Sequence, residues 1–415
     1  MEHLIKRKFL EDLKKHLSQK EMSLVIGPRQ AGKTTLMMLL KEYLEKKGER
    51  TLFLNLDFEQ DKPFFESQSS LMNRIKLEFG SKKGYVFIDE IQRKENAGLF
   101  LKGIYDLNVP YKMIISGSGS VELKEKVHES LVGRKRIFEL NTVSFEEFVN
   151  FRTAYRYEDR LSGFFSIEAH KTKDLLVEYL NLGGYPRVIL ADTLHEKIKV
   201  IDEIYKSYIE KDITYLLRVE KTDAFRNLIK MLASQVAGMI NVAELSSTLG
   251  ISIQTVKNYL MYAEKTFVIK KVTPYFSNVR KEISKSPMVY FTDLGLRNYS
   301  LGLFGRISLL TEMGFLFQNF VFHLLQEKWR YESASIHFWR TKDRAEVNFV
   351  INIGKTVLPV EVKCRELKEE AVSRPLRNFI AMYNPKEAWI VNLGFKKEIK
   401  IEKTIVKFIP FYELI

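Results

Sequence analysis

Short apolar segments alternate with helical patterns over the first third of the chain. Near-continuous apolar strands separated by helices are typical of a parallel sheet that is buried on both faces. A fifth apolar segment is expected to close this sheet. The pattern therefore predicts an α/β core. Its strands are expected at residues 22–27, 51–57, 84–90, 111–119 and 135–141.

The hydrophobic pattern changes twice further along the chain. Residues 146–225 have apolar positions spaced near 3.6, the period of an amphipathic helix. Residues 226–304 predict three short helices and a pair of strands. Residues 305–415 predict a long helix followed by strands. We therefore expect four parts, with the α/β core covering residues 1–145. The C-terminal strands are expected at residues 335–340, 345–352, 357–363 and 387–392.

The composition adds expectations about partners and location. The 66 Lys and Arg exceed the 52 Asp and Glu, a formal net charge of +14. This excess favours a polyanionic partner such as nucleic acid, although proteins of heat-tolerant organisms are also rich in lysine. The one cysteine, Cys364, excludes an internal disulfide and indicates a cytoplasmic protein. No apolar run reaches the roughly 18 residues of a membrane span, and residues 1–17 predict an amphipathic helix rather than a signal peptide.

The stretch "GPRQAGKTT" matches the phosphate-loop pattern G-x-x-x-x-G-K-[ST]. It follows a predicted strand and opens a predicted helix, so backbone N–H groups and the helix N-terminus would face a phosphate. Lys33 is expected to bridge the β- and γ-phosphates of ATP, and the Thr34 hydroxyl to complete a Mg²⁺ shell. The expected nucleotide-binding residues are Gly27, Pro28, Arg29, Gln30, Ala31, Gly32, Lys33, Thr34 and Thr35.

An acidic pair ends the predicted strand at residues 84–90. Ligands gather at the carboxyl ends of strands in open α/β sheets. We expect Asp89 to hold Mg²⁺ through water and Glu90 to act as the general base that polarises the attacking water. The alternative is a strand that simply ends in a solvated acidic pair, and the phosphate loop elsewhere in the same sheet makes this alternative less favoured.

Two further residues are candidates for catalysis. Ser116, or Ser118 if the strand ends later, is placed to hydrogen-bond the γ-phosphate or the lytic water. Arg134 is a candidate arginine finger, and a surface arginine is the alternative. An arginine supplied across an interface would imply a homo-oligomer.

The motifs extend along nearly the whole chain in one order: "GPRQAGKTTL", "YVFIDEIQ", "IISGSGS", "SLVGR", "SFEEF", "NLGGYPRVI", "IEKDI" and "FWRTKDRAEVNFVI…LPVEVK". In these the chain resembles the prokaryotic AAA-type P-loop ATPases that carry a C-terminal DUF4143 region. The resemblance implies an AAA+ P-loop sheet at 1–145, a lid-like helical segment at 146–225, a winged helix at 226–304 and a degenerate PD-(D/E)XK module, restriction-endonuclease-like, at 305–415. It also implies that Gly184 and Pro186 lie near the adenine or ribose, whereas a helix C-cap followed by proline explains the same residues.

The segment at 242–278 has the layout of a helix-turn-helix with a wing. Gly250 is expected in the tight turn and Ser252 at the N-cap of the second helix, with Ile253, Val256 and Tyr259 or Leu260 buried. DNA contact is one interpretation, and a lid or protein-contact module is the other. The side chains expected to face outward are Ser252, Gln254, Thr255, Lys257 and Asn258, and the basic residues expected around the wing are Lys270, Lys271, Arg280, Lys281 and Lys285.

The strands at 345–352 and 357–363 resemble a nuclease core that lacks its carboxylates. Glu361 and Lys363 share a strand face, with Val360 and Val362 expected behind them, while the neutral amides Asn348 and Gln318 stand where acidic ligands are expected. Mg²⁺ strongly prefers carboxylate oxygen. We expect a nuclease fold without nuclease activity, in which Glu361 and Lys363 form a partly buried ion pair; the active alternative would need Glu346 as a second ligand.

Three functions follow from these motifs. The leading one is an ATP-hydrolysing switch or remodeller that binds ATP and Mg²⁺ and acts on DNA or on a protein bound to DNA. The second is a nucleotide-dependent binding module with negligible turnover. The third is an ATP-driven, metal-dependent DNA endonuclease.

Overall fold

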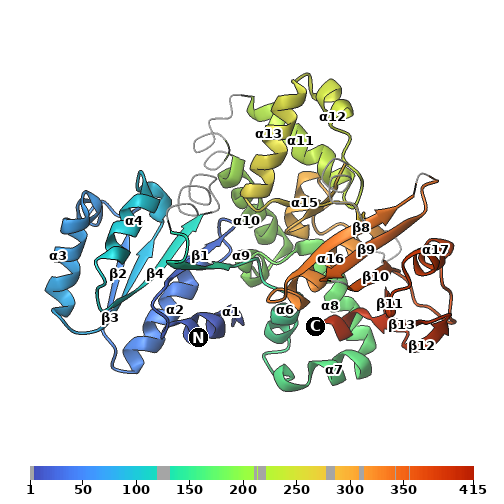
Figure 1. The fold of residues 1–415 in the computed structure, drawn as a ribbon, viewed down its shortest axis with the longest axis horizontal. Helices are drawn as coiled ribbons and strands as arrows, with labels where there is room; N and C mark the ends of the chain where they lie inside the picture. Colours follow the sequence, from blue (N-terminus) through green and yellow to red (C-terminus); the bar gives the residue numbers. More distant parts are fainter. Residues whose placement is uncertain are drawn as a thin grey trace.

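The computed structural model describes residues 4–118, 131–209, 213, 221–276, 286–307, 313–341, 343–354 and 356–415. Two sheets lie at opposite ends of the molecule, with helices between and above them (Figure 1). Within the described residues no helix combines the length and apolar character that crossing a bilayer requires.

The N-terminal sheet has five parallel strands in the order β2-β3-β4-β1-β5. All five predicted strands are confirmed. Because β4 lies between β1 and β3, the ends of these three strands are neighbours at one edge of the sheet. The strands are β1 (Met22–Gly27), β2 (Thr51–Asn55), β3 (Gly84–Asp89), β4 (Tyr111–Ser118) and β5 (Lys135–Glu139).

Helices cover both faces of this sheet. Alternate residues of a strand point to opposite faces, and Val25 packs with α1 and α2 whereas Leu24 and Ile26 pack with α3 and α4. The helix predicted within residues 1–17 begins only at Phe9. The helices are α1 (Phe9–His16), α2 (Lys33–Lys46), η1 (Lys62–Phe65), α3 (Gln68–Phe79), η2 (Ile91–Arg93) and α4 (Ala97–Asp106).

The predicted helical segment divides between two hydrophobic cores. Its first half packs with the C-terminal part, where Phe145 contacts Phe320 and Phe411 at ring-centroid distances of 5.3 and 5.9 Å. Its second half packs with the part that follows it in sequence. The helices are α6 (Phe145–Arg152), η3 (Glu158–Arg160), α7 (Leu161–Ile167), α8 (Ala169–Leu182), α9 (Pro186–Leu190) and α10 (Leu194–Ser207).

Three helices and an antiparallel strand pair follow, as predicted. They are α11 (Thr222–Ser234), α12 (Val242–Leu249), α13 (Ile253–Lys265), β6 (Ile269–Val272) and β7 (Met288–Phe291), and the short helix α15 (Leu294–Ser300) comes after them.

The turn before α13 has the predicted geometry. Gly250 has a φ of 62°, and the Ser252 hydroxyl accepts a 3.0 Å hydrogen bond from the Thr255 amide. The prediction that Ile253 is buried is wrong, because its side chain is 48% exposed. Ile253 is the first residue of α13. The buried face of this helix begins one turn later, with Val256 and Tyr259.

The C-terminal sheet has six strands in the order β12-β13-β11-β10-β9-β8. The pairs β10–β11 and β11–β13 are parallel, and the other pairs are antiparallel. The long helix and four strands were predicted, whereas α17, β12 and β13 were not. The elements are α16 (Gly314–Lys328), β8 (Ala334–Arg340), β9 (Glu346–Ile353), β10 (Thr356–Val362), α17 (Arg374–Tyr383), β11 (Glu387–Asn392), β12 (Lys397–Ile401), β13 (Thr404–Pro410) and η6 (Phe411–Leu414).

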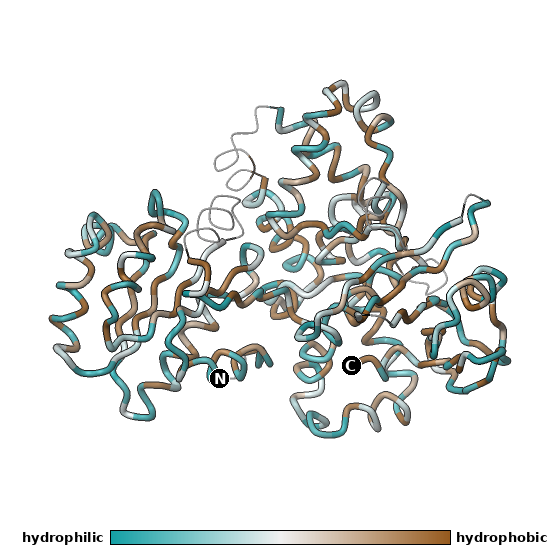
Figure 2. The backbone as a smooth tube through the Cα atoms, viewed as in Figure 1, coloured by the Kyte–Doolittle hydropathy of each residue, from teal (hydrophilic) through white to brown (hydrophobic). Residues whose placement is uncertain are grey.

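Hydrophobic residues follow the strands of both sheets, whereas the outer helices carry many polar positions (Figure 2). Helices α16 and α17 pack in different cores around the C-terminal sheet, so both of its faces are covered. The strand pair β6–β7 also reaches this sheet, since the Phe338 amide donates to the Thr273 carbonyl. The C-terminal part is therefore tied to both segments that precede it.

Candidate nucleotide-binding site

A cleft of about 470 Å³ lies beside the phosphate loop, where β1 and β3 end. The loop, the N-terminal residues and α9 form its walls. Apolar side chains line part of it, and basic and acidic groups line the rest. The lining residues are Leu4, Ile5, Arg7, Arg29, Gln30, Gly32, Lys33, Thr34, Thr35, Leu36, Leu39, Glu90, Pro186, Arg187, Leu190 and Ser207.

Close backbone packing shapes the phosphate loop. A Cβ at Gly27 would lie 2.1 Å from the Leu140 carbonyl oxygen, so only glycine lets the two segments approach. The Lys33 ammonium is buried and donates to the carbonyls of Gly27 (3.1 Å) and Pro28 (2.8 Å). The lysine is thus held at the loop by the backbone that would surround a phosphate.

The loop and the acidic strand end meet in one hydrogen bond. The Thr34 hydroxyl donates to Asp89 Oδ2 at 2.7 Å, although the two residues are 55 positions apart. Asp89 is 1% exposed and ends β3, as the sequence predicted. A hydroxyl and a carboxylate are oxygen donors of the kind that Mg²⁺ prefers, so these two residues fit the predicted ion.

Ser116 lies deeper than the sequence suggested. Its side chain is fully buried, and its hydroxyl donates to Asp89 Oδ1 rather than facing the cleft. The hydroxyl also accepts a 3.4 Å hydrogen bond from the Glu90 amide. Ser116 therefore contacts Asp89 and Glu90 from the buried interior rather than from the cleft. The alternative candidate, Ser118, has its side chain outside the described residues.

Glu90 lines the cleft directly after Asp89. Its φ of 58° turns the chain sharply away from β3, and its carboxylate accepts a hydrogen bond from the Gln92 amide group. Burial raises the pKa of Glu90, the Lys33 ammonium lowers it and the Asp89 carboxylate raises it. The group is thus placed at the loop with an increased affinity for protons.

Arg134 lies far from the loop of its own chain. The Met22 amide donates to its carbonyl, which places Arg134 at the start of β1, whereas the loop follows the end of that strand. A six-residue strand spans roughly 17 Å. The guanidinium instead pairs with Asp106 at 2.8 Å. Arg134 therefore does not reach the loop of its own chain, and its ion pair fits the alternative of a surface arginine.

Helix α9 supplies a wall that the sequence predicted only in part. Pro186 lines the cleft as the resemblance implied, and its Cγ lies 3.8 Å from an ideal Cβ at Gly32. Arg187, which the sequence analysis missed, donates to the Gln30 side chain at 2.9 Å. Gly184 does not line the cleft in the part of the chain that is described, because its amide donates to Asp293. Its expected place near adenine or ribose stays a prediction.

The N-terminal residues supply a third wall that sequence reasoning also missed. Arg7 donates to the carbonyl of Ala31 in the loop at 3.0 Å and to that of Asn141 at 2.7 Å. Its Nε pairs with Glu147 at 3.0 Å, and both side chains are nearly buried. Since Glu147 belongs to the capping box of α6, Arg7 joins the phosphate loop to the helical segment.

Residues 344–363, which were expected to resemble a nuclease core, lie at a separate place and are engaged in structural contacts. Glu361 is buried, pairs with Lys363 at 2.5 Å and accepts from the Ser373 hydroxyl at 2.8 Å, so the predicted ion pair is confirmed. The Asn348 side chain accepts from the Val362 amide at 2.9 Å, and Val362 is only half-buried, unlike the expectation.

The other two candidate ligands are held in the same way. Gln318 donates to the Tyr290 hydroxyl at 2.8 Å, and Glu346 pairs with Arg340 at 3.2 Å. Across the described ranges, no three His, Cys, Asp or Glu side chains are grouped so that they could hold a metal ion.

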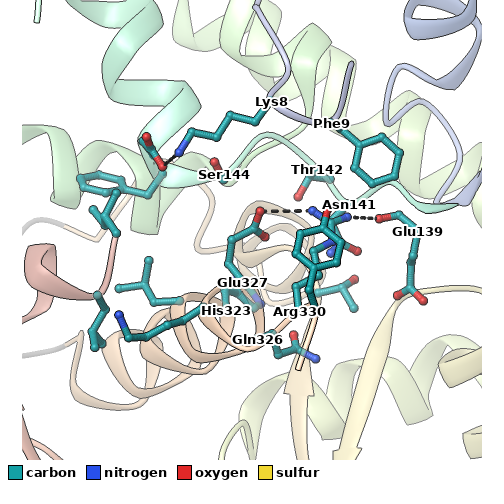
Figure 3. Close-up of a pocket in the computed structure, with 18 of the residues that line it drawn as sticks. Lys8, Phe9, Glu139, Asn141, Thr142, Ser144, His323, Gln326, Glu327 and Arg330 are labelled. Atoms are coloured by element: carbon teal, nitrogen blue, oxygen red, sulfur yellow. Dashed lines mark hydrogen bonds and ion pairs between the residues drawn. The ribbon is translucent and has the colours of Figure 1, made fainter. Parts of the chain in front are cut away.

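A larger cavity, of about 710 Å³, lies where the N-terminal sheet, β6–β7 and α16 meet (Figure 3). Arg330 donates to the Glu139 carbonyl at 2.5 Å and pairs with Glu327, and Lys270 pairs with the Glu139 carboxylate at 2.8 Å. Thr142 lies in the same wall. The end of β5 is therefore held by basic residues from distant parts of the chain.

Family models match three successive stretches of this chain. The AAA domain matches residues 19–149, and two domains of unknown function match residues 173–306 (DUF8612) and 313–414 (DUF4143). The parallel sheet, the phosphate loop at its edge and the AAA match together support an AAA-type P-loop ATPase domain in the N-terminal part. The C-terminal DUF4143 match agrees with the resemblance seen in the sequence.

Similar proteins occur in bacteria and archaea. An uncharacterized protein of Mycobacterium tuberculosis is 26% identical over 369 residues, covering 88% of this chain and 75% of the relative. One of Methanocaldococcus jannaschii is 24% identical over 418 residues, covering 97% and 90%.

Among solved structures, the replication initiator DnaA bound to AMPPCP and single-stranded DNA overlaps with a TM-score of 0.30 at 15% identity, covering 64% of this chain and 91% of that one. The Cdc6p structure from Pyrobaculum aerophilum has a TM-score of 0.30 at 10% identity, covering 73% and 96%.

Proposed function

We propose that the protein binds ATP with Mg²⁺ in the 470 Å³ cleft, hydrolyses it and uses the cycle to move its C-terminal parts. The observation that carries this proposal is the Thr34–Asp89 hydrogen bond, which joins the phosphate loop to the acidic strand end. Lys33 and Glu90 lie in the same cleft. A lysine, a hydroxyl and two carboxylates around one loop are the groups that phosphoryl transfer needs.

Each residue has a defined role in the proposed reaction. The backbone of residues 27–32 and the start of α2 bind the phosphates, and Lys33 bridges the β- and γ-phosphates. Glu90 accepts a proton from water as the water oxygen bonds to the γ-phosphorus, and the bond from that phosphorus to the β–γ bridging oxygen breaks to release ADP. Arg187, which contacts Gln30 and pairs with Glu203 at 2.9 Å, neutralises phosphate charge from the α9 side when its guanidinium turns from Glu203 to the nucleotide. Thr34 and Asp89 would hold Mg²⁺, which when bound supplies positive charge to the phosphate oxygens.

The pH dependence of turnover tests the role of Glu90. A general base acts only when deprotonated, and burial raises the pKa of Glu90, so activity should be lost as the pH falls through a value above 4.5, the ordinary glutamate pKa. The measurement is kcat/KM for ATP between pH 4.5 and 9. A rate that stays constant down to the ordinary glutamate pKa would contradict this role.

We propose that residues 226–304 form a winged helix that contacts double-stranded DNA. The first turns of α13 expose Ser252, Ile253, Gln254 and Lys257, a set of groups able to contact base edges, a thymine methyl and phosphates. This part of the chain has ten Lys and Arg against four Asp and Glu.

The wing contributes less than its sequence suggested. Lys270 and Lys271 are ion-paired with Glu139 and Glu264, both at 2.8 Å, so they are less available to phosphates than was expected. Arg280, Lys281 and Lys285 lie outside the described residues. The proposed DNA contact therefore centres on α13.

Replacing Lys257 with glutamate tests this contact. DNA affinity should fall about tenfold and the salt dependence of binding should weaken, because one phosphate contact is lost. Fluorescence anisotropy with a labelled duplex at several salt concentrations measures both. Lys400→Glu, an exposed position on β12, makes the same change in net charge and should have little effect. Equal effects of the two substitutions would refute a specific role for α13.

We infer that the C-terminal α/β part is a nuclease-like module that binds or docks without cleaving. The engagement of Glu361, Asn348 and Gln318 in structural hydrogen bonds supports this interpretation. Arg134 remains a candidate finger only for a neighbouring copy in a homo-oligomer. Steady-state ATP turnover with and without single- and double-stranded DNA tests the whole proposal, because stimulation by duplex DNA would link the cleft to residues 226–304.

A further inference from the structure

Asp293 is a fully buried carboxylate between β7 and α15, far in sequence from the cleft. It caps α15, since Oδ1 accepts a 2.9 Å hydrogen bond from the Leu296 amide. Oδ2 accepts a 2.8 Å hydrogen bond from the Gly184 amide, 109 positions away. The Thr142 hydroxyl also hydrogen-bonds the carboxylate. One side chain thus joins α15, the turn after α8 and the segment after β5.

The turn after α8 fits tightly against Asp293. A Cβ at Gly183 would lie 2.4 Å from Asp293 Oδ1, which leaves no room for any other residue. From the same helix as Leu296, the Asn298 side chain donates to the carbonyls of Leu180 (2.8 Å) and Asn181 (2.9 Å). Helix α15 therefore caps the end of α8 and fixes the direction in which the chain leaves it.

The chain that leaves this turn enters the cleft at once. Pro186 and Arg187 follow Gly184 by two and three positions and line the cleft, and Arg187 reaches Gln30 of the phosphate loop. The other contact of Asp293, Thr142, adjoins Asn141, whose carbonyl accepts from Arg7. Asp293 thus contacts two segments of the chain, one that leads directly into the α9 wall of the cleft and one that adjoins the carbonyl held by Arg7.

A buried carboxylate is costly unless donors surround it. Burial raises the pKa of Asp293, and the hydrogen bonds from Gly184, Leu296, Thr142 and Gly295 lower it. An asparagine would have the same shape, but its NH₂ group would face N–H and O–H donors. The site is therefore built for a carboxylate.

We propose that Asp293 is a positioning residue for the nucleotide cleft, which holds the turn at Gly183–Tyr185 so that Arg187 faces the terminal phosphate of ATP. This inference rests on the proposed ATP-binding function. According to this proposal, residues 226–304 determine the position of the cleft wall that α9 forms. A movement of α15 would then change affinity for ATP, and ATP binding would resist that movement.

The Asp293→Asn variant tests the proposal, and the quantity to compare is the ratio of its affinities for ATP and ADP. We expect ATP to bind about tenfold more weakly and ADP less than threefold more weakly, because Arg187 would lose its place at the terminal phosphate. Titration with fluorescent ATP and ADP analogues measures both affinities. In the double variant with Arg187→Ala, the loss should be no larger than for Arg187→Ala alone. The proposal would be overturned if the losses of ATP affinity added in the double variant. It would also be overturned if Asp293→Asn preferred ATP over ADP as strongly as the wild type does.

A matched control separates positioning from general destabilisation. Asn319 is equally buried and holds β7 to α16 through two 2.8 Å hydrogen bonds with the Phe291 backbone, two residues before Asp293. Asn319→Ala should lower the melting temperature and leave the ATP-to-ADP preference unchanged. The same loss of preference in this control would show that Asp293 acts only on stability.

A milder variant covers the case in which Asp293→Asn does not fold. Thr142→Val removes one donor at constant shape and should weaken ATP binding two- to fivefold; an unchanged affinity would overturn the proposal. If the wild-type protein itself binds neither nucleotide, the proposed function fails and this inference fails with it. If the wild type binds and the variants match it, only the inference fails.

Discussion

Replacing Lys33 with alanine should remove measurable ATP binding. The ammonium is buried at the phosphate loop, and in the proposed complex it bridges two phosphates. Hydrogen bonds between charged partners contribute roughly 1.5 to 3 kcal/mol each, so losing two weakens binding by about a hundredfold or more. Titration of the purified variant with a fluorescent ATP analogue, or isothermal calorimetry, measures the affinity.

Lys41→Ala is the matched control for this variant. Lys41 lies on the same helix, α2, and pairs with Glu45 on the surface at 2.6 Å. Its substitution should change neither ATP affinity nor turnover. Wild-type binding by Lys33→Ala would refute the assignment of the cleft to nucleotide, and with it the proposed function.

Replacing Glu90 with glutamine should nearly abolish ATP hydrolysis while ATP still binds. The amide cannot accept a proton from water, and a positioned general base contributes about 10²- to 10⁴-fold to rate. Steady-state phosphate release and nucleotide titration on the same preparation measure the two effects. Glu95→Gln, an exposed glutamate five positions further on, provides the control and should hydrolyse ATP normally.

The same experiment separates two of the three functions. If wild-type turnover is already negligible and Glu90→Gln leaves it unchanged, the protein is a nucleotide-dependent binding module rather than an ATPase. A loss of ATP binding in Glu90→Gln would instead show that Glu90 has a structural role at the end of β3.

The N-terminal sheet could be predicted from sequence because its determinants are local. Each strand is a short apolar run, and each functional group stands next to one. The phosphate loop is a contiguous pattern, and Asp89 directly ends an apolar strand, so each was recognised separately. Their meeting through Thr34 depends on the strand order, which the structure shows. In the C-terminal sheet, β12 carries alternating charged residues on an exposed edge and gives too weak an apolar pattern to be recognised.

Contacts between residues distant in sequence set the limit of the prediction. Arg134 directly precedes β5 in the same sheet as the loop, but the parallel pairing of β5 with β1 places it at the opposite end of β1 from the loop. Arg187 stands beside the recognised "GGYP" motif and could have been inferred from Pro186. Asp293 gives no local signal, because its partner Gly184 is 109 positions away. Only the fold shows why those two residues matter to each other.

The packing of Phe145 against Phe320 and Phe411 constrains how this architecture can be rearranged by recombination. A gene fusion that transferred only residues 313–415 to another ATPase would leave behind the aromatic rings that complete its interior. Helices α6 and α8 would have to be transferred together with the C-terminal sheet. The smallest part that could be transferred intact is therefore discontinuous in sequence. A nucleotide-driven shift of α6 and α8 would also act directly on the C-terminal sheet, because these helices pack against it.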